Sequence, residues 1–229
     1  FVLFDFDGVI ANTEESNAAY LEKALSAFGI QLTDDDRKAL IGTNDKTRIE
    51  SLLSRSLVKV TAEDLAGKRR QVGNTYENSC IRPMPGVVSL IQEIRGRGIK
   101  TGLVTSTSTR LIMIALNRMR MTALFDVVIC GDMCANHKPD PECYKKAMDY
   151  LGAEPCKCIV FEDSAVGIHA ARLAGARVAA YRGSGIQQDV SEADLIVDSY
   201  DECKDMLDDI MQGKITQGRI TQGVIMPCK

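Results

Sequence analysis

Short apolar runs recur along the chain, and each has the length of a buried β-strand. The runs are Val2–Phe4, Thr101–Val104, Val127–Ile129, Ile159–Phe161, Val178–Ala180 and Leu195–Val197. Most intervening segments repeat apolar residues at the i, i+3, i+4, i+7 spacing of an amphipathic helix, as in Val87, Leu90, Ile91 and Ile94. Strands that alternate with helices are joined by right-handed crossovers. The pattern therefore predicts an α/β fold with a Rossmann-like parallel sheet and helices on both faces.

Residues 14–80 interrupt this alternation, because they contain helical periods alone. The periods are marked by Leu21, Ala24, Leu25 and Phe28, by Ile49, Leu52 and Leu53, and by a stretch from about Thr61 to Tyr76. We expect an all-helical cap domain of residues 14–80, inserted after the first strand of a discontinuous core domain of residues 1–13 and 81–212. The remaining residues, 213–229, form a C-terminal tail in which a repeated Ile-Thr-Gln-Gly segment predicts a short hairpin or a loose terminus.

Composition narrows the classes of partner and compartment. The 229 residues carry a formal net charge of −3, so nothing indicates a surface for nucleic acid or for a membrane. The apolar runs are far shorter than the roughly 18 residues that span a bilayer, and no signal-peptide pattern is present. The eight cysteines lack C-x-x-C spacing. This argues against a zinc site and favours free thiols in a reducing cytoplasm.

Two carboxylates stand where the first predicted strand ends, in the segment Asp5-Phe6-Asp7-Gly8. Side chains two residues apart on a strand share a face, so both carboxylates are expected at the end of the sheet where α/β proteins bind ligands. Like charges this close resist joint ionisation unless a cation or a proton intervenes. The pair therefore indicates a metal site or acid–base chemistry, although the same tetrapeptide also occurs in surface turns and calcium loops.

Polar residues follow further predicted strands. Thr105 and Ser106 offer a hydroxyl and backbone N–H groups where a helix opens, which suits an anion; taken alone, they fit an ordinary helix cap better. Lys138 lies on a turn that Pro139 and Pro141 hold rigid, although most lysines are solvated surface charges. Neither segment identifies a site without the others.

Glu162 and Asp163 form a second acidic pair at the end of a strand, and a helix begins just after them. Taken alone, such a pair is explained equally well by the favourable position of acidic side chains at a helix N-terminus. Near Asp5 and Asp7 it would crowd like charges, unless a divalent cation lies between the two pairs. Hard oxygen ligands of this kind predict Mg²⁺, which keeps several waters and pairs with substrate phosphate.

In this order and at these strand ends, the motifs resemble those of the haloacid dehalogenase superfamily. The matching segments are Asp5-Phe6-Asp7-Gly8-Val9, Val104-Thr105-Ser106, Lys138-Pro139, Phe161-Glu162-Asp163-Ser164 and the run from Gly167 to Gly175. The resemblance covers about residues 1–200. The helical insert is similar to the cap of the subgroup that includes β-phosphoglucomutase and phosphoglycolate phosphatase.

The resemblance implies a role for each acidic residue of the motifs. Asp5 would be the nucleophile that forms an aspartyl-phosphate, and Asp7 would act first as the acid and then as the base. Mg²⁺ would be held by Asp5, by the backbone carbonyl of Asp7, by Asp163 and, directly or through water, by Glu162. An aspartate at position 7 also favours phosphate esters over halides, because a halide leaves without a proton.

The same resemblance implies that Thr105, the Ser106 amide and Lys138 hold the phosphate oxygens. In the cap, the segment that contains residues 42–47 is similar to the substrate-specificity loop of the subgroup. The predicted specificity residues are Gly42, Thr43, Asn44 and Lys46.

The expected protein is a Mg²⁺-dependent cytoplasmic phosphatase, monomeric or weakly dimeric, that acts on a small phosphorylated metabolite such as a sugar phosphate. A phosphosugar mutase is one alternative. Where β-phosphoglucomutase carries a histidine early in the first cap helix, this chain has Asn17, and the cap-loop arginine has no clear counterpart. The other alternative is a phosphate-binding protein without catalytic activity, against which the full set of carboxylates argues.

Overall fold

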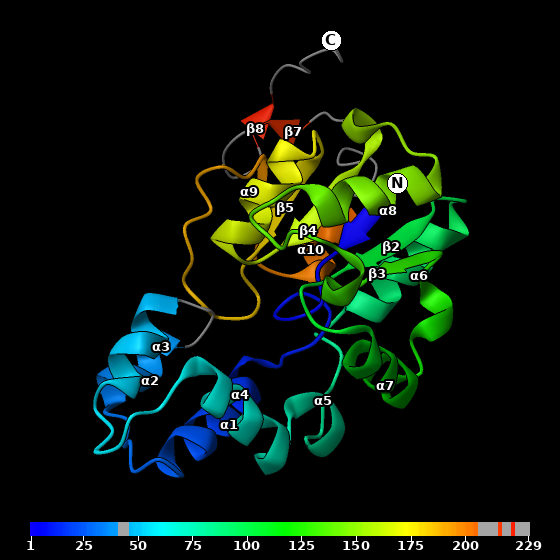
Figure 1. Cartoon of the computed structure of the whole chain (residues 1–229). Coiled ribbons are helices and arrows are strands. Elements are labelled where there is room, and N and C mark those ends of the chain that lie inside the picture. Colours follow the sequence, from blue (N-terminus) through cyan, green and yellow to red (C-terminus); the bar gives the residue numbers. More distant parts are fainter. Residues whose placement is uncertain (41–45, 206–214, 217–220, 223–229) are drawn as a thin grey trace. The chain divides into compact units, whose positions relative to one another are not determined.

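The computed structural model describes residues 1–40, 46–205, 215–216 and 221–222. The chain forms two compact units (Figure 1): residues 1–12 together with the chain from Arg82 onward, and residues 13–81. The polypeptide passes between the units twice, at 12–13 and at 81–82.

The first unit is built on a six-stranded parallel sheet with the order β3-β2-β1-β4-β5-β6. Its strands are β1 (Val2–Phe4), β2 (Thr101–Val104), β3 (Val127–Ile129), β4 (Ile159–Glu162), β5 (Arg177–Tyr181) and β6 (Leu195–Val197). The predicted α/β class and its six strands are confirmed, with β4 and β5 slightly longer than predicted. Because β1 lies between β2 and β4, the carboxyl ends of these three strands are adjacent where the strand order changes direction, the usual ligand-binding position.

Helices cover both faces of this sheet (Figure 1). They are α6 (Val87–Gly96), α7 (Thr109–Met119), α8 (Glu142–Leu151), α9 (Ala165–Leu173) and α10 (Tyr200–Asp205), with 3-10 turns η1 (Thr122–Leu124), η2 (Gly131–Met133) and η3 (Pro155–Lys157). Helix α8 packs on β2 and β3, α9 packs on β4 and β5, and α6 packs on β2 and on α10.

Consecutive residues of a strand pack on opposite faces of the sheet. Leu3 belongs to the core cluster formed with α8 and α9, whereas Phe4 stacks on Phe161 with ring centroids 5.0 Å apart. Both Leu3 and Phe4 are fully buried. A sheet covered on both faces explains why its strands are apolar at consecutive positions.

The second unit is helical. Its helices are α1 (Glu14–Ser26), α2 (Asp34–Leu40), α3 (Lys46–Leu53), α4 (Ala62–Val72) and α5 (Thr75–Asn78). They enclose their own hydrophobic core, made of Leu21, Ala24, Leu25, Ile30, Leu32, Leu40, Leu52, Leu53 and Leu65. The unit therefore buries apolar surface independently of the sheet, which is the main source of its stability.

The third helix predicted for this segment is wrong in length, because it is divided into α4 and α5. Gly73 adopts φ +97°, in the left-handed region that glycine tolerates, and ends α4. Asn74 then caps α5, because its side chain accepts a hydrogen bond from the Glu77 N–H at 3.0 Å.

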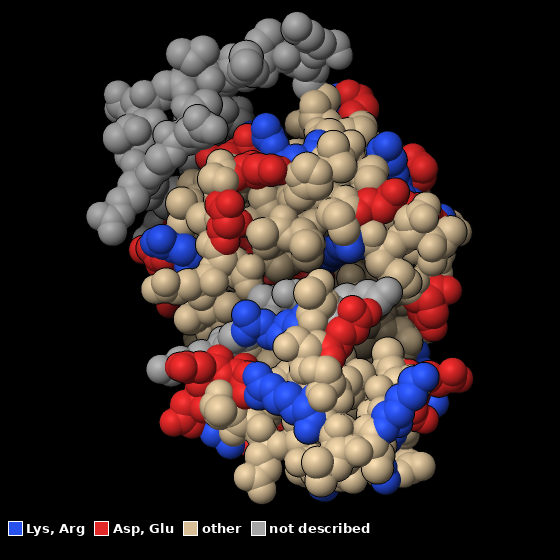
Figure 2. All heavy atoms as spheres, turned by 60° about the vertical axis from the view of Figure 1, so that its left-hand side comes forward, with Lys and Arg blue, Asp and Glu red and all other residues tan. Residues whose placement is uncertain are grey.

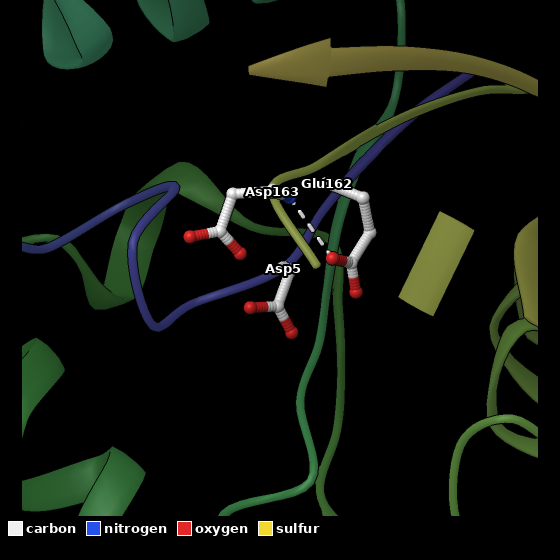
Figure 3. Close-up of side chains that lie close together, drawn as sticks. All are labelled: Asp5, Glu162 and Asp163. Atoms are coloured by element: carbon white, nitrogen blue, oxygen red, sulfur yellow. Dashed lines mark hydrogen bonds between the residues drawn. The ribbon is translucent and has the colours of Figure 1, made fainter. Parts of the chain in front are cut away.

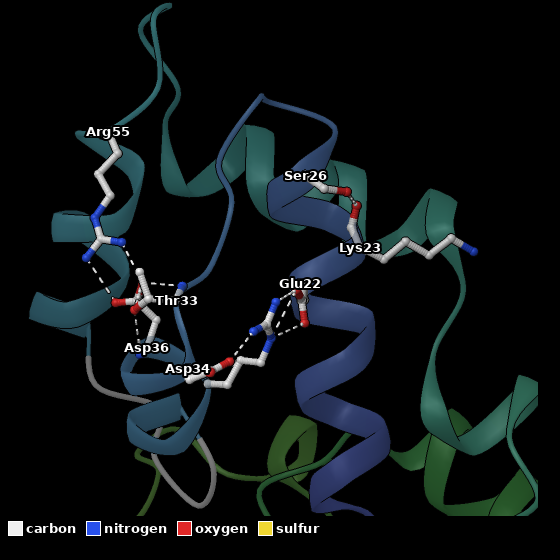
Figure 4. A network of polar contacts seen from close by, with 8 residues as sticks. Glu22, Lys23, Ser26, Thr33, Asp34, Asp36 and Arg55 are labelled. Carbon is white, nitrogen blue, oxygen red and sulfur yellow. Dashed lines mark hydrogen bonds and ion pairs between the residues drawn. The ribbon is translucent and has the colours of Figure 1, made fainter.

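Helix α2 has no counterpart among the predicted helices, and polar contacts define it (Figure 4). The Thr33 hydroxyl accepts a hydrogen bond from the Asp36 N–H, and the Asp36 carboxylate accepts one from the Thr33 N–H, which is a capping box. Arg37 pairs with Glu22 of α1 at 2.7 Å, and Arg55 pairs with Asp36 at 2.6 Å. Because these ion pairs lie at or near the surface, they contribute little to stability. They link α2 to α1 and to the turn after α3.

Charged side chains of both signs are interspersed on the face drawn in Figure 2, as the small net charge implies. Within the described residues, no helix is both long and apolar enough to cross a membrane. In the tail, β7 (Ile215–Thr216) and β8 (Thr221–Gln222) pair antiparallel, which agrees with the expected short hairpin.

The cysteines agree only partly with the expectation of free thiols. The free thiols among the described residues are Cys80, Cys130, Cys134, Cys143, Cys158 and Cys203. Cys156, in contrast, is disulfide-bonded, which the spacing of cysteines along the chain does not indicate.

Candidate active site

Three carboxylates and one ammonium group converge at the carboxyl ends of β1, β2 and β4. Asp5 follows β1, Glu162 ends β4, Asp163 follows it, and Lys138 comes from the segment before α8. Carboxylate oxygens of Asp5, Glu162 and Asp163 lie within 4.8 Å of one another (Figure 3). The structure thus brings together residues that are up to 158 positions apart in the sequence (163 − 5).

The loop after β1 positions the first two carboxylates. The Asp5 N–H donates to the Phe161 carbonyl at 2.9 Å, which ties the start of the loop to β4. Gly8 has φ +76°, and a Cβ built there would overlap the carboxylate of Asp163. Only glycine satisfies both conditions, so the loop can pass directly beside the second acidic pair.

Lys138 is buried among these carboxylates. Its Nζ donates to Asp5 Oδ1 at 2.6 Å, to Glu162 Oε1 at 2.7 Å and to the Val104 carbonyl at 3.1 Å. These three bonds hold the ammonium group at the carboxyl ends of β1 and β2. The peptide bond between Lys138 and Pro139 is cis. Lys138 is therefore buried against these carboxylates and is not a solvated surface lysine.

Glu162 is fully buried and accepts hydrogen bonds on both oxygens. Oε1 accepts from Lys138 and from the Tyr144 hydroxyl, the latter at 3.0 Å. Oε2 accepts from the N–H groups of Asp163 and Ser164 and from the Ser164 hydroxyl, each at 3.0 Å. The Ser164 hydroxyl in turn caps α9 by accepting from the Gly167 N–H. These donors fix the direction of the Glu162 carboxylate.

Burial and neighbouring charges shift the pKa values of this group. Burial, together with the carboxylates of Glu162 and Asp7, raises the pKa of Asp5 to about 8 against the attraction of Lys138. Burial opposes the charge on Lys138, yet Asp5 and Glu162 raise its pKa well above the usual value. Burial would also raise the pKa of Glu162, but Lys138 and Ser164 hold it below its usual value.

The donor set suits a hard divalent cation. Asp5, Glu162 and Asp163 offer only carboxylate oxygens, the ligand type that Mg²⁺ prefers. Burial raises the pKa of Asp5 in spite of Lys138, so additional positive charge beside Asp5 would favour its ionised form. A cation held between Asp5 and Asp163 would supply that charge.

The predicted phosphate-binding loop follows β2. The buried Thr105 hydroxyl accepts from the Thr107 N–H at 3.1 Å, so it can donate its own hydrogen to an anion. Ser106 is exposed, and a Cβ at Gly131 would overlap its carbonyl, so η2 packs directly on the loop. The Thr107 hydroxyl donates to Asp7 Oδ2 at 3.1 Å.

The predicted specificity residues of the cap stay predictions. Gly42, Thr43 and Asn44 lie outside the described residues. Lys46 is the first residue of α3, and its side chain also lies outside the described part of the chain.

Sequence reasoning missed two residues that contact the site. Tyr144 falls in the apolar period of a helix, although a buried tyrosine hydroxyl requires a polar partner, here Glu162. Thr107 stands in a run of serine and threonine residues, and its bond to Asp7 joins positions one hundred residues apart. A local pattern carries no signal for such a contact.

Known proteins resemble this chain in sequence and in fold. A family model described as "Haloacid dehalogenase-like hydrolase" matches residues 2–181. The "Phosphorylated carbohydrates phosphatase" of Thermotoga maritima is 30% identical over 76% of this chain and 81% of its own. The crystal structure of CbbY from Rhodobacter sphaeroides in complex with phosphate superimposes with a TM-score of 0.73 at 27% identity, covering 88% of this chain and 95% of that one. A putative β-phosphoglucomutase from Thermotoga maritima gives a TM-score of 0.71 at 27% identity over 91% of this chain and 98% of that one.

Proposed function

The chain belongs to the haloacid dehalogenase-like hydrolases, and from this we propose that it is a Mg²⁺-dependent phosphatase acting on a small phosphorylated metabolite of the sugar phosphate class. The substrate class is suggested by the name of the Thermotoga maritima relative. The reaction class rests on the residues of this chain.

The contact between Lys138 and Asp5 carries the proposal. A carboxylate repels a phosphate dianion, so a carboxylate nucleophile needs positive charge beside it. Lys138 Nζ lies 2.6 Å from Asp5 Oδ1 and is held there by two further acceptors, on Val104 and Glu162. An ammonium group preorganised in a buried site can stabilise developing phosphoryl charge at little reorganisation cost.

The chain's own residues would perform two displacements. Asp5 attacks phosphorus, the ester P–O bond breaks, and Asp7 gives its proton to the leaving alkoxide. Asp7, now a carboxylate, takes a proton from water, which attacks phosphorus and releases Asp5. The Thr107 hydroxyl orients Asp7 through its bond to Oδ2. Lys138 and Thr105 hold the phosphoryl oxygens in both steps.

Mg²⁺ would be held by the carboxylates of Asp5 and Asp163, by the backbone carbonyl of Asp7 and, directly or through water, by Glu162. When bound, it would supply charge that screens Asp5 from the phosphate and polarises a phosphoryl oxygen. Without it, Asp5 is largely protonated below pH 8, because its pKa is raised to about 8.

Phosphate release from a panel of phosphorylated metabolites, with and without Mg²⁺, tests the proposal. We expect a subset of sugar phosphates to be hydrolysed, and exhaustive chelation to abolish the activity. Asp5→Asn should lower kcat at least about a thousandfold, since the amide cannot attack phosphorus. A folded wild-type protein that releases phosphate from no substrate, including a generic aryl phosphate, would refute the proposal in favour of a phosphate-binding protein.

A phosphosugar mutase is the second candidate, and the similarity to the putative β-phosphoglucomutase favours it. Against it stands Asn17, where the mutase has a histidine. In this chain the Asn17 Oδ1 accepts a hydrogen bond from the Thr75 hydroxyl at 2.7 Å. The amide of asparagine cannot transfer a proton as the imidazole of histidine does. Isomerisation of a sugar phosphate that requires a bisphosphate primer would identify the mutase; primer-independent phosphate release would identify the phosphatase.

A further inference from the structure

Tyr144 lies in the first turn of α8, next to Lys138 and Glu162, and its side chain is fully buried. Its hydroxyl donates to Glu162 Oε1 at 3.0 Å. Its ring faces Lys138, with the ammonium nitrogen 4.8 Å from the ring centroid. Tyr144 therefore contacts both members of the Lys138–Glu162 pair, through two different parts of its side chain.

Both contacts restrict the lysine. A lysine side chain has four rotatable carbon bonds and loses much conformational entropy when it is held in one place. A ring face within about 6 Å attracts the ammonium group, more strongly where water is excluded. The hydroxyl acts indirectly, because it shares Oε1 with Lys138 and so fixes the carboxylate to which the ammonium group is bonded.

We propose that Tyr144 is a positioning residue for Lys138: its ring and hydroxyl hold the ammonium group where it meets the phosphoryl oxygens. The proposal rests on the proposed function in one respect, that Lys138 binds phosphate. The competing explanation is that Tyr144 only fills the core, since it also packs in the cluster of α8 and α9. Core filling predicts a loss of stability without a change in phosphate affinity.

The variants separate these explanations. Tyr144→Phe removes the hydroxyl and keeps the ring, whereas Tyr144→Met removes both and fills irregular core space. The two differ in shape, so a folding defect in one leaves the other as a test. Tyr150→Phe is the matched control, because Tyr150 lies on the same helix with 76% of its surface exposed.

For each folded variant we would measure kcat, KM, the inhibition constant of inorganic phosphate and the melting temperature. Tyr144→Phe should weaken phosphate inhibition and lower kcat/KM by about tenfold, the size of a hydrogen bond to a charged group. Tyr144→Met should lose about a further tenfold through the missing ring face. Tyr150→Phe should match the wild type.

A double-mutant comparison isolates the route through the lysine. In a Lys138→Ala background, Tyr144→Phe should have no further effect on phosphate inhibition. If Tyr144→Phe leaves phosphate inhibition unchanged while Lys138→Ala weakens it, the positioning role is refuted and the proposed function stands. If Lys138→Ala also leaves phosphate inhibition unchanged, the role of Lys138 itself fails, and the inference fails with it.

Discussion

Replacing Gly8 by alanine tests how closely the first loop must approach the second acidic pair. Gly8 has φ +76°, and Gly98 in the same unit has φ +75°. An alanine in the left-handed region costs roughly 1–2 kcal/mol. Gly8→Ala and Gly98→Ala should therefore both lower the free energy of unfolding by about that amount. The two positions differ in the room available for a side chain. A Cβ at Gly98 meets nothing within 4 Å, whereas a Cβ at Gly8 overlaps the carboxylate of Asp163.

The additional effect of Gly8→Ala should appear in the metal dependence. Asp163 must rotate away from the new methyl group, which costs about 1 kcal/mol if it leaves its rotamer. Displacing an acidic residue of the predicted metal site should raise the Mg²⁺ concentration for half-maximal activity at least about tenfold, in the range seen for disturbed metal sites. Gly98→Ala should keep the wild-type value.

Urea unfolding gives the stability of each glycine variant, and a Mg²⁺ titration of phosphate release gives the metal dependence. The reasoning would be refuted if Gly8→Ala behaved like Gly98→Ala in both measurements. The Gly8–Asp163 approach would then have no consequence for the site.

Three other perturbations test separate parts of the site. Thr107→Val should lower kcat by about tenfold in steady-state kinetics, because Asp7 loses its hydroxyl partner. Ser108→Ala serves as the control. An unchanged kcat for Thr107→Val would contradict the role of Thr107 in orienting Asp7. The raised pKa of Asp5 means that Mg²⁺ binding displaces a proton below pH 8, so calorimetry should show apparent affinity rising with pH up to about 8 and levelling above it. The metal-free protein should correspondingly lose stability as pH rises from the ordinary aspartate range toward 8. A Mg²⁺ affinity that does not change with pH would count against Asp5 as a metal ligand with a raised pKa. Deletions within residues 43–46 should change substrate preference more than the rate with acetyl phosphate, and an equal loss for all substrates would remove the predicted specificity role.

Much of the sheet could be predicted from the sequence, because each strand is a short apolar run and both faces are covered. The apolar run at Val2–Phe4 ends directly at Asp5, so the order of residues alone places the first site residues at the end of a strand. Helix α2 escaped prediction because its first turn is acidic and because its contacts are with the capping residue Thr33 and with Glu22 and Arg55, which are distant in the sequence.

The contacts around Lys138 could be predicted only in part. The motifs placed Lys138, Asp5 and Glu162 at one edge of the sheet, since all follow strands of that sheet. They could not show that Lys138 is buried or that Tyr144 supports it, because both facts depend on the packing of α8. Burial also sets the raised pKa of Asp5, which residue type alone does not indicate.

The central claim is that Asp5 is the nucleophile, and trapping the covalent intermediate tests it most directly. Wild-type enzyme would be mixed with substrate and Mg²⁺, quenched in acid within one turnover, digested and analysed by mass spectrometry. We predict a phosphoryl group on the peptide that contains Asp5, located at Asp5 and absent from Asp5→Asn. An unmodified Asp5 in the quenched wild-type enzyme during rapid turnover, or normal turnover by Asp5→Asn, would contradict the account.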